Sequence, residues 1–245
     1  MKKIKFLAAV CCMLAVFTAC ENDTKSKIEE LENRIEGLEN GGNSDTGNDT
    51  DQNGGNSNTG SDNATGTANG HGYVDLGLPS GLKWATCNVG ASAPEEYGDY
   101  YAWGETSTKS SYDTDNSKTY GKSMGNIGGN SSYDVVRYRW GGSWRMPTKA
   151  ELEELKTKCT WTWTTQGGHN GYKVTSKTNG KSIFLPTAGW RDGASPIYVG
   201  ESGYYWSSSP HESNTRSAYS LYFYSSGHDV DWYRRSLGFS VRPVV

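Results

Sequence analysis

Hydrophobic and polar positions divide the chain into four stretches of different character. Residues 1–20 place three lysines before an apolar run, which is typical of a secretory signal segment. Residues 21–40 carry apolar residues at heptad spacing, and residues 41–70 carry no aromatic and no branched aliphatic residue. All nine Trp and all sixteen Tyr lie in residues 71–245, so we expect the folded domain there.

Within that domain the pattern predicts one helix between residues 140 and 159. Thr148 and Glu151 have the spacing of a capping box, in which each side chain accepts the other residue's backbone N–H. Leu152, Leu155 and Cys159 follow at helical spacing and form the predicted buried stripe.

The other elements of the domain are predicted to be short strands. Residues 78–81, Leu-Pro-Ser-Gly, predict a turn between two of them. Residues 160–189 are expected to be strands with a hairpin turn at Asn179-Gly180, and residues 109–129 a long polar loop. In residues 218–224 apolar and polar positions alternate, so Leu221 and Phe223 should face the core. Ser220, Tyr222 and Tyr224 should point the other way.

The first stretch ends in Phe-Thr-Ala-Cys, which resembles a bacterial lipobox, the signal whose Cys is lipidated and becomes the new N-terminus. We therefore expect Cys20 to anchor the protein in the outer membrane; an ordinary cleaved signal is the alternative. Glu21 and Asp23 resemble a surface-export tag and favour the cell surface over the periplasm.

The second stretch carries a short heptad seam formed by Ile28, Leu31, Ile35 and Leu38. This spacing predicts a coiled-coil stalk, and residues 27–39 could form a parallel homodimer or trimer. Two heptads are short, so a lone, frayed stalk helix is the equal alternative. Residues 41–70 should act as a disordered Gly/Asn/Asp/Ser linker, with an average end-to-end span of about 30 Å.

The C-terminal part has the composition of a binding surface. Residues 204–236 include six Tyr and nine Ser, and no Lys follows residue 181. Tyr offers rigid amphipathic contact area and Ser adaptable hydrogen bonding. The candidate ligand-binding residues lie in the loop before the alternating strand, on that strand, and in the predicted loop and adjoining residues that follow it. They are His211, Glu212, Ser213, Asn214, Arg216, Tyr222, Tyr224, His228, Asp229, Asp231, Trp232, Tyr233 and Arg234.

Seven motifs of the domain occur in an order that resembles a known family. They are GLKWATCNVGA, YGDYYAWGE, WRMPTKAELEEL, IFLPTAGWR, YYWSSS, LYF and GFSVRPV. They resemble the Fibrobacter succinogenes major paralogous domain of Bacteroidetes surface lipoproteins, related to the formylglycine-generating-enzyme branch of the C-type-lectin-like fold. The resemblance implies an α+β domain with short twisted strands and one or two helices, whose N- and C-terminal strands pair.

The same branch includes variable proteins that retroelements diversify near the C-terminus. Adenine-directed mutagenesis of Asn codons yields Tyr, Ser, Asp, His, Gly and Arg among other residues. Residues 210–235 are largely of this palette, although Glu212 and Trp232 do not fit it. An ordinary, undiversified paralogue is the favoured interpretation.

Metal, cofactor and catalytic roles find little support in the residues. The Glu-Pro-Asn and Trp-Asn-Asp signatures of calcium-dependent lectins are absent, and no cofactor or metal is expected. The formylglycine-type enzymes use a reactive Cys pair late in the chain, whereas this domain has only Cys87 and Cys159. In an exported protein such a pair is expected to form a disulfide or to remain as two buried thiols.

The sequence therefore predicts a non-enzymatic, lipid-anchored module that presents its C-terminal surface to a glycan or a protein on another cell or host surface. A net charge of −3 argues against nucleic-acid binding, and membrane contact should occur through the lipid anchor only. Three alternatives stay open. They are a retroelement-diversified binding protein, a structural or tip subunit of a surface assembly, and an active relative of the formylglycine-type enzymes.

Overall fold

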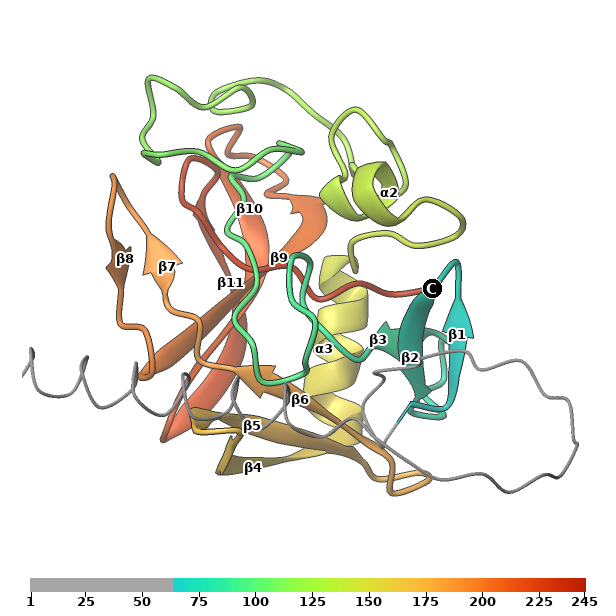
Figure 1. Cartoon of the computed structure of the whole chain (residues 1–245). Coiled ribbons are helices and arrows are strands. Elements are labelled where there is room, and N and C mark those ends of the chain that lie inside the picture. The colour runs from blue at the N-terminus through green and yellow to red at the C-terminus, as the bar shows by residue number, and fades with distance from the viewer. Residues whose placement is uncertain (1–63) are drawn as a thin grey trace, which may run out of the picture. The chain divides into compact units, whose positions relative to one another are not determined.

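The computed structural model describes residues 64–245, which form a mostly β structure with two helices (Figure 1). The predicted signal segment with Cys20, the predicted stalk and linker residues 41–63 lie outside the described residues. In chain order the elements are β1 (Gly66–Ala68), β2 (His71–Asp75), β3 (Lys83–Ala85), α2 (Val135–Trp140), α3 (Lys149–Lys158), β4 (Cys159–Gln166), β5 (His169–Ser176), β6 (Ser182–Pro186), β7 (Trp190–Arg191), β8 (Pro196–Ile197), β9 (Ser202–Pro210), β10 (Ser217–Tyr224) and β11 (Gly227–Arg234).

The strands form four small antiparallel sheets, in the orders β1-β2-β3, β4-β5-β6, β7-β8 and β9-β10-β11. None of these sheets closes into a barrel within residues 64–245. The α+β expectation is confirmed at this coarse level, with β structure predominating. The described part has no helix of the length and apolar character needed to cross a bilayer.

The β9-β10-β11 sheet separates two hydrophobic clusters, because neighbouring residues of β9 point to opposite faces. Tyr205 packs into one cluster with α3 and the β4-β5-β6 sheet, where Leu155, Val174 and Phe223 are buried. Trp206 packs into the other, together with the long coil before α2 and the C-terminal segment. Both faces of β9 are therefore covered along most of its length.

The predicted helix is confirmed as α3, and its capping box is present in both directions. Leu152 and Leu155 are buried as expected. Cys159 is also buried, but it is the first residue of β4 and not part of the helix. The chain turns directly from α3 into β4 at this residue, which a helical periodicity does not reveal.

Two predicted turns are confirmed, and one predicted loop is wrong. The backbone N–H of Gly81 donates to the carbonyl of Leu78 at 2.9 Å, and Gly81 has a φ of 72°. Asn179 and Gly180 lie in the turn that joins the antiparallel strands β5 and β6. The segment with His228, Asp229 and Asp231, expected to be a loop, is the edge strand β11, paired with β10 along eight residues.

The resemblance implied that the two ends of the domain pair, and the C-terminal residues do pair with β3 in the first sheet of the described domain. The C-terminal residue Val245 exchanges two backbone hydrogen bonds with Lys83 of β3, at 2.9 and 3.0 Å. Val244 pairs on the other side with Arg145, also through two bonds, and its side chain is fully buried. The last residues thus close the domain between β3 and the segment that leads into α3 (Figure 1).

Two buried arginines each donate hydrogen bonds to oxygen atoms of segments that are far apart in the sequence. Arg242 donates to the Asn88 amide oxygen and to the backbone carbonyls of Ala85, Thr86 and Phe184. Its burial lowers the pKa of the guanidinium.

Arg235 donates to the carbonyls of Ser217, Thr119 and Lys122, and its guanidinium lies 4.3 Å from the centre of the Trp103 ring. Burial lowers the pKa of Arg235 to about 10, so the group stays charged at neutral pH. The long polar coil before α2 is thereby attached to the end of β11.

The disulfide between Cys87 and Cys159 is not formed, and both are free thiols. Cys159 lies in the cluster beneath α3, where burial raises the pKa of its thiol to about 11. Cys87 is half-buried after β3 and has the Thr86 hydroxyl 3.5 Å from its sulfur. Of the two alternatives from the sequence, the unbonded pair is the one present.

Candidate ligand-binding groove

A groove of about 570 Å³ opens where the β4-β5 hairpin, the turn between β8 and β9, and the end of β10 meet. Four of its lining residues are aromatic, and most of the others are small or polar. The lining residues are Trp163, Asn170, Tyr198, Gly200, Glu201, Ser202, Tyr204, Tyr224 and Ser225. Such a volume is typical of small-ligand sites, which span roughly 300–1,000 Å³.

One wall of the groove comes from the pairing of β9 with β10. Tyr222 lies directly opposite Tyr204, and Tyr224 opposite Ser202, so these side chains share one face of the sheet. The Tyr204 and Tyr222 rings stack at 6.2 Å, and the Tyr222 and Tyr224 rings at 6.5 Å. A row of three tyrosines therefore leads from the core out to the rim.

The second wall comes from the β4-β5 hairpin. Trp163 packs edge-to-face on Tyr172, its partner in the pairing of the two strands. The Tyr172 hydroxyl donates to the Tyr224 carbonyl at 3.2 Å, which attaches this hairpin to the end of β10. Asn170 accepts from the Thr165 hydroxyl and donates to the Gly200 carbonyl, so its amide holds the next segment in place.

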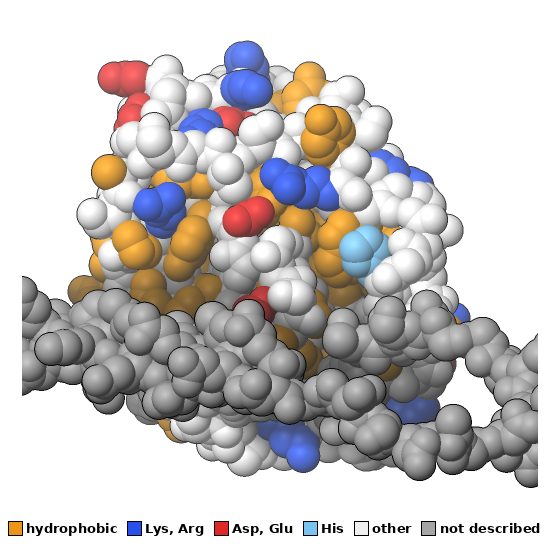
Figure 2. Space-filling view, in the orientation of Figure 1, with side chains coloured by type: hydrophobic (Ala, Val, Ile, Leu, Met, Phe, Trp, Pro, Cys, Tyr) orange, Lys and Arg blue, Asp and Glu red, His pale blue; other side chains and the backbone are white. Residues whose placement is uncertain are grey.

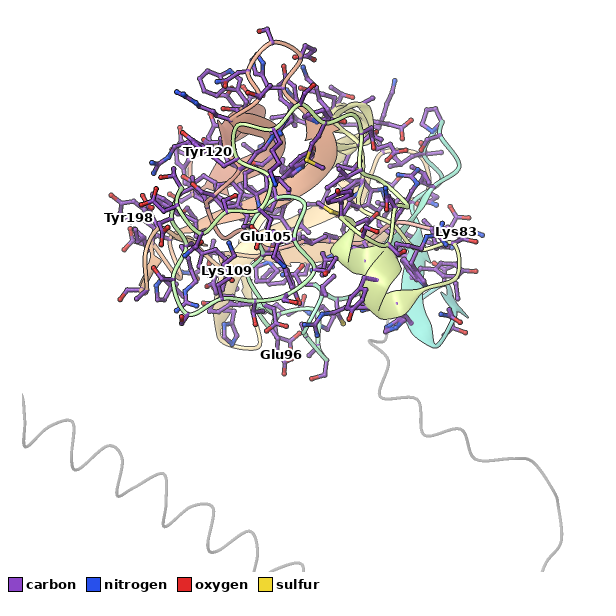
Figure 3. The ribbon with its side chains drawn as sticks, turned by 90° about the horizontal axis from the view of Figure 1, so that it is seen from above. Lys83, Glu96, Glu105, Lys109, Tyr120 and Tyr198 are labelled. Carbon is purple, nitrogen blue, oxygen red and sulfur yellow. The ribbon has the colours of Figure 1, made fainter. Side chains whose placement is uncertain are left out.

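The third side is the turn from Tyr198 to Glu201. The Tyr198 carbonyl accepts the N–H groups of Glu201 and Ser202, both at 3.1 Å, and the Gly200 N–H donates to the Thr187 carbonyl. Tyr198 has a φ of 54°, in the left-handed region, where a non-glycine residue costs roughly 1–2 kcal/mol. Its ring is 56% exposed and lies at the periphery of the molecule (Figure 3).

The groove is weakly acidic and rich in phenol groups. Glu201, which is exposed, is the one charged residue among its described lining residues. Burial, and then the neighbouring Tyr222, raises the pKa of Tyr204. Burial, followed by the nearby Asp229, also raises the pKa of Tyr222. These phenols therefore remain protonated at neutral pH and can donate as well as accept hydrogen bonds.

Among the residues predicted from the sequence, Tyr224 lines the groove and Tyr222 lies next to it in the tyrosine row. Asp229 and Asp231 are on the same face of β11 and exposed; Asp229 also forms a 2.7 Å ion pair with Lys156 of α3. Tyr233 is half-buried and packs edge-to-face on Tyr204 and Tyr222, so it contacts the tyrosine row on the same face of the sheet.

Other predicted residues gather elsewhere, at the opposite end of β10 and on its other face. His211 stacks on Tyr219 and contacts the edge of Trp232, while Glu212 accepts the Tyr219 hydroxyl at 2.6 Å. Tyr219 precedes Tyr224 by five residues, which is about 17 Å along a strand. The sequence therefore grouped two surfaces that the structure separates.

Several predicted side chains in the loop before β10 build that loop. The His211 Nδ1 atom accepts the N–H groups of Ser213 and Asn214, and the Asn214 side chain bonds Arg216 and Ser217.

On β11, Arg234 forms a surface ion pair with Asp192 at 2.7 Å. His228 stacks on Trp161 at 4.3 Å, and burial lowers the pKa of its imidazole.

Eight of the nine groove-lining residues were not among the binding residues predicted from the sequence, and they include Trp163, Tyr198, Glu201 and Tyr204. The alternation Trp161-Thr162-Trp163 in β4 could have indicated Trp163 from the sequence, because it places both Trp rings on one face of the strand. Nothing local distinguishes Tyr198 or Glu201. Their role comes from a backbone turn that long-range hydrogen bonds define.

Within residues 64–245, no three His, Cys, Asp or Glu side chains gather in a way that could hold a metal ion. The groove lining itself offers aromatic rings, hydroxyls, one side-chain amide and one carboxylate.

Comparison with known families gives one match. Residues 168–244 match a family described as "Domain of unknown function (DUF8237)". This segment contains every groove-lining residue except Trp163. No curated protein and no solved structure matches the chain significantly.

Proposed function

We propose that this protein is a non-enzymatic binding protein of the cell surface, whose groove between β4-β5, the Tyr198 turn and the end of β10 holds the ligand. We also propose a C-type-lectin-like fold for the domain, in line with its paired ends and small twisted sheets. The proposed anchor is a lipid on Cys20, followed by the stalk and the linker.

The observation that carries the proposal is the groove itself. Four aromatic side chains and a few polar groups surround a volume suited to a small ligand or to a short segment of a larger one. No His and no second carboxylate lines it among the described residues, so it lacks the acid–base pair that most hydrolytic sites require.

The position of the groove agrees with a display role. Lys83 of β3 and Tyr198 lie at opposite edges of the domain (Figure 3). Because β1 joins the same small sheet as β3, the described chain begins on the side away from Tyr198. A tether that enters at residue 64 would therefore attach on the side of the domain away from Tyr198 (Figure 3).

The test is binding of the full chain to arrays of glycans and of surface proteins, followed by affinity measurements on variants. Tyr224→Ala removes a half-exposed ring from the groove and should weaken binding roughly tenfold. Trp232→Ala is the matched control, since Trp232 is equally exposed but lies on the other face of the sheet. Equal losses from the two variants, with both folded, would contradict the groove as the binding site.

A further inference from the structure

The chemistry of the groove indicates which ligand it suits. Tyr198 and Tyr224 are 56% and 48% exposed, so both rings offer a free face at the rim. Aromatic faces bind flat apolar surfaces, and phenol hydroxyls bind alcohol groups in either direction. A sugar ring combines these two features, since it has an apolar face and a rim of hydroxyls.

The charge of the groove narrows the ligand class. Among the described lining residues there is no Lys and no Arg, and the single charge is the Glu201 carboxylate. Asp231 adds negative charge on the same face of the sheet as Tyr222, while Asp229 on that face is paired with Lys156. Sulfated or uronate-bearing glycans would meet repulsion here, whereas the carboxylate can accept strong hydrogen bonds from neutral hydroxyls.

The backbone at Tyr198 supplies an independent observation. A bulky side chain in the left-handed region is a true outlier, and such strain persists where the surrounding structure imposes it. Here the Tyr198 carbonyl accepts two N–H groups, and the neighbouring Gly200 is tied to Thr187. An asparagine would adopt this conformation with less strain, yet the chain places an exposed aromatic ring at the rim of the groove.

We infer that the groove binds a segment of a neutral carbohydrate without calcium, and that Tyr198 is the aromatic side chain at the rim on which a sugar ring packs. This inference rests on the proposed binding function and names its ligand class. A volume near 570 Å³ fits a short stretch of sugar units and not the surface of a folded partner.

The experiment measures binding of the full chain to soluble mannan, xylan and mixed-linkage β-glucan, to heparin, and to an oligoarginine peptide, each with EDTA and with calcium. At least one neutral polysaccharide should bind equally in both buffers, and heparin should not bind. Tyr198→Asn should weaken that binding roughly tenfold while the melting temperature stays the same or rises. Tyr138→Asn is the control, since Tyr138 is 61% exposed on α2 and does not line the groove.

The possible failures are separable. Three results would overturn the inference and keep the groove as a binding site. The first is that only oligoarginine or heparin binds, and the second is that EDTA abolishes binding. The third is that Tyr198→Asn leaves the binding of a neutral sugar intact. If neither this panel nor the protein array yields a ligand, both the inference and the proposed function fall.

Discussion

Arg234 and Arg235 are adjacent in sequence but experience opposite environments. Arg234 is half-exposed and pairs with Asp192 at the surface. Arg235 is 1% exposed, donates to three backbone carbonyls and packs on Trp103. Removing a buried donor leaves its acceptors unsatisfied, which costs far more than losing a solvated ion pair.

Replacing Arg235 by Met keeps much of the side-chain volume but removes all its hydrogen bonds. We expect Arg235→Met to lower the free energy of unfolding by about 3 kcal/mol, measured by urea denaturation. Arg234→Met should lower it by less than about 1 kcal/mol. Similar losses for both variants would show that Arg235 does not hold the coil before α2.

The same contrast shows why composition alone does not tell which residues are exposed. Ser207, Ser217 and Ser220 belong to the Ser-rich stretch that indicated a binding surface, yet all three are buried. Ser207 donates to the Tyr219 carbonyl at 2.8 Å, in the neighbouring strand. Whether a small polar side chain is displayed or buried depends on partners far along the chain, which a local pattern does not contain.

At the scale of elements, α3 shows how much a local sequence can determine. Its capping box joins Thr148 to Glu151, and Arg145 adds a two-point ion pair to the same carboxylate, at 2.6 and 2.8 Å. Burial alone would raise the pKa of Glu151, but the bonds from Arg145 and Thr148 outweigh it and hold the pKa below its usual value.

A carboxyl whose pKa is lower in the folded state stabilises the fold above its unfolded pKa and loses this effect as the pH falls. Glu151→Gln should therefore cost about 2 kcal/mol at pH 7, and the difference from the unmodified protein should shrink as the pH drops below about 4.5. Denaturant titrations at several pH values measure this. Glu153→Gln, on the same helix in a surface pair with Lys156, should show little effect at any pH.

Strands were harder to predict than this helix. The alternation in β10 correctly placed Leu221 and Phe223 in the core, because one face of the strand is apolar. In β11, however, Asp229 and Asp231 alternate with Val230 and Trp232, and the segment reads as polar and exposed. Edge strands commonly carry charges that prevent pairing with other chains, so their polarity hides the strand.

At the scale of the whole molecule, the domain closes through its last residues. Val244 and Val245 together make four backbone hydrogen bonds, to Arg145 and to Lys83, and Val244 is completely buried. The family resemblance predicted this pairing of the ends, but periodicity alone did not.

Deleting Val244 and Val245 removes those bonds and opens a cavity between two segments. We expect a loss of at least about 4 kcal/mol in the free energy of unfolding, seen as a lower denaturation midpoint. Val245→Ala keeps the backbone pairing and should cost less than about 1 kcal/mol. A shortened chain as stable as the full one would mean that the closure contributes little.

The groove was predictable only in part, because it is assembled from three separate segments. Tyr222 and Tyr224 stood out from the alternation in one strand. Tyr198 and Glu201 instead take their places from the hydrogen bonds that Gly200 makes with Thr187 and Asn170. The surface view shows hydrophobic side chains gathered over β7 and β8, next to this region (Figure 2). The residues of a binding surface formed by tertiary contacts can be recognised only once the fold is known.

The small β1-β2-β3 sheet has a mechanical consequence for a protein that is anchored at Cys20 and holds its ligand in the groove. A pull between the cell and a bound ligand would enter the domain at residue 64. It would reach first β1, which is three residues long, pairs with β2 alone, and is held elsewhere by the Trp144 indole N–H that donates to the Ala68 carbonyl. Because β3 is held on its far side by residues 243–245, β1 should peel away before the rest yields. Releasing residues 64–69 would add about 20 Å of extended chain, which would lengthen the tether under load while the groove stays intact.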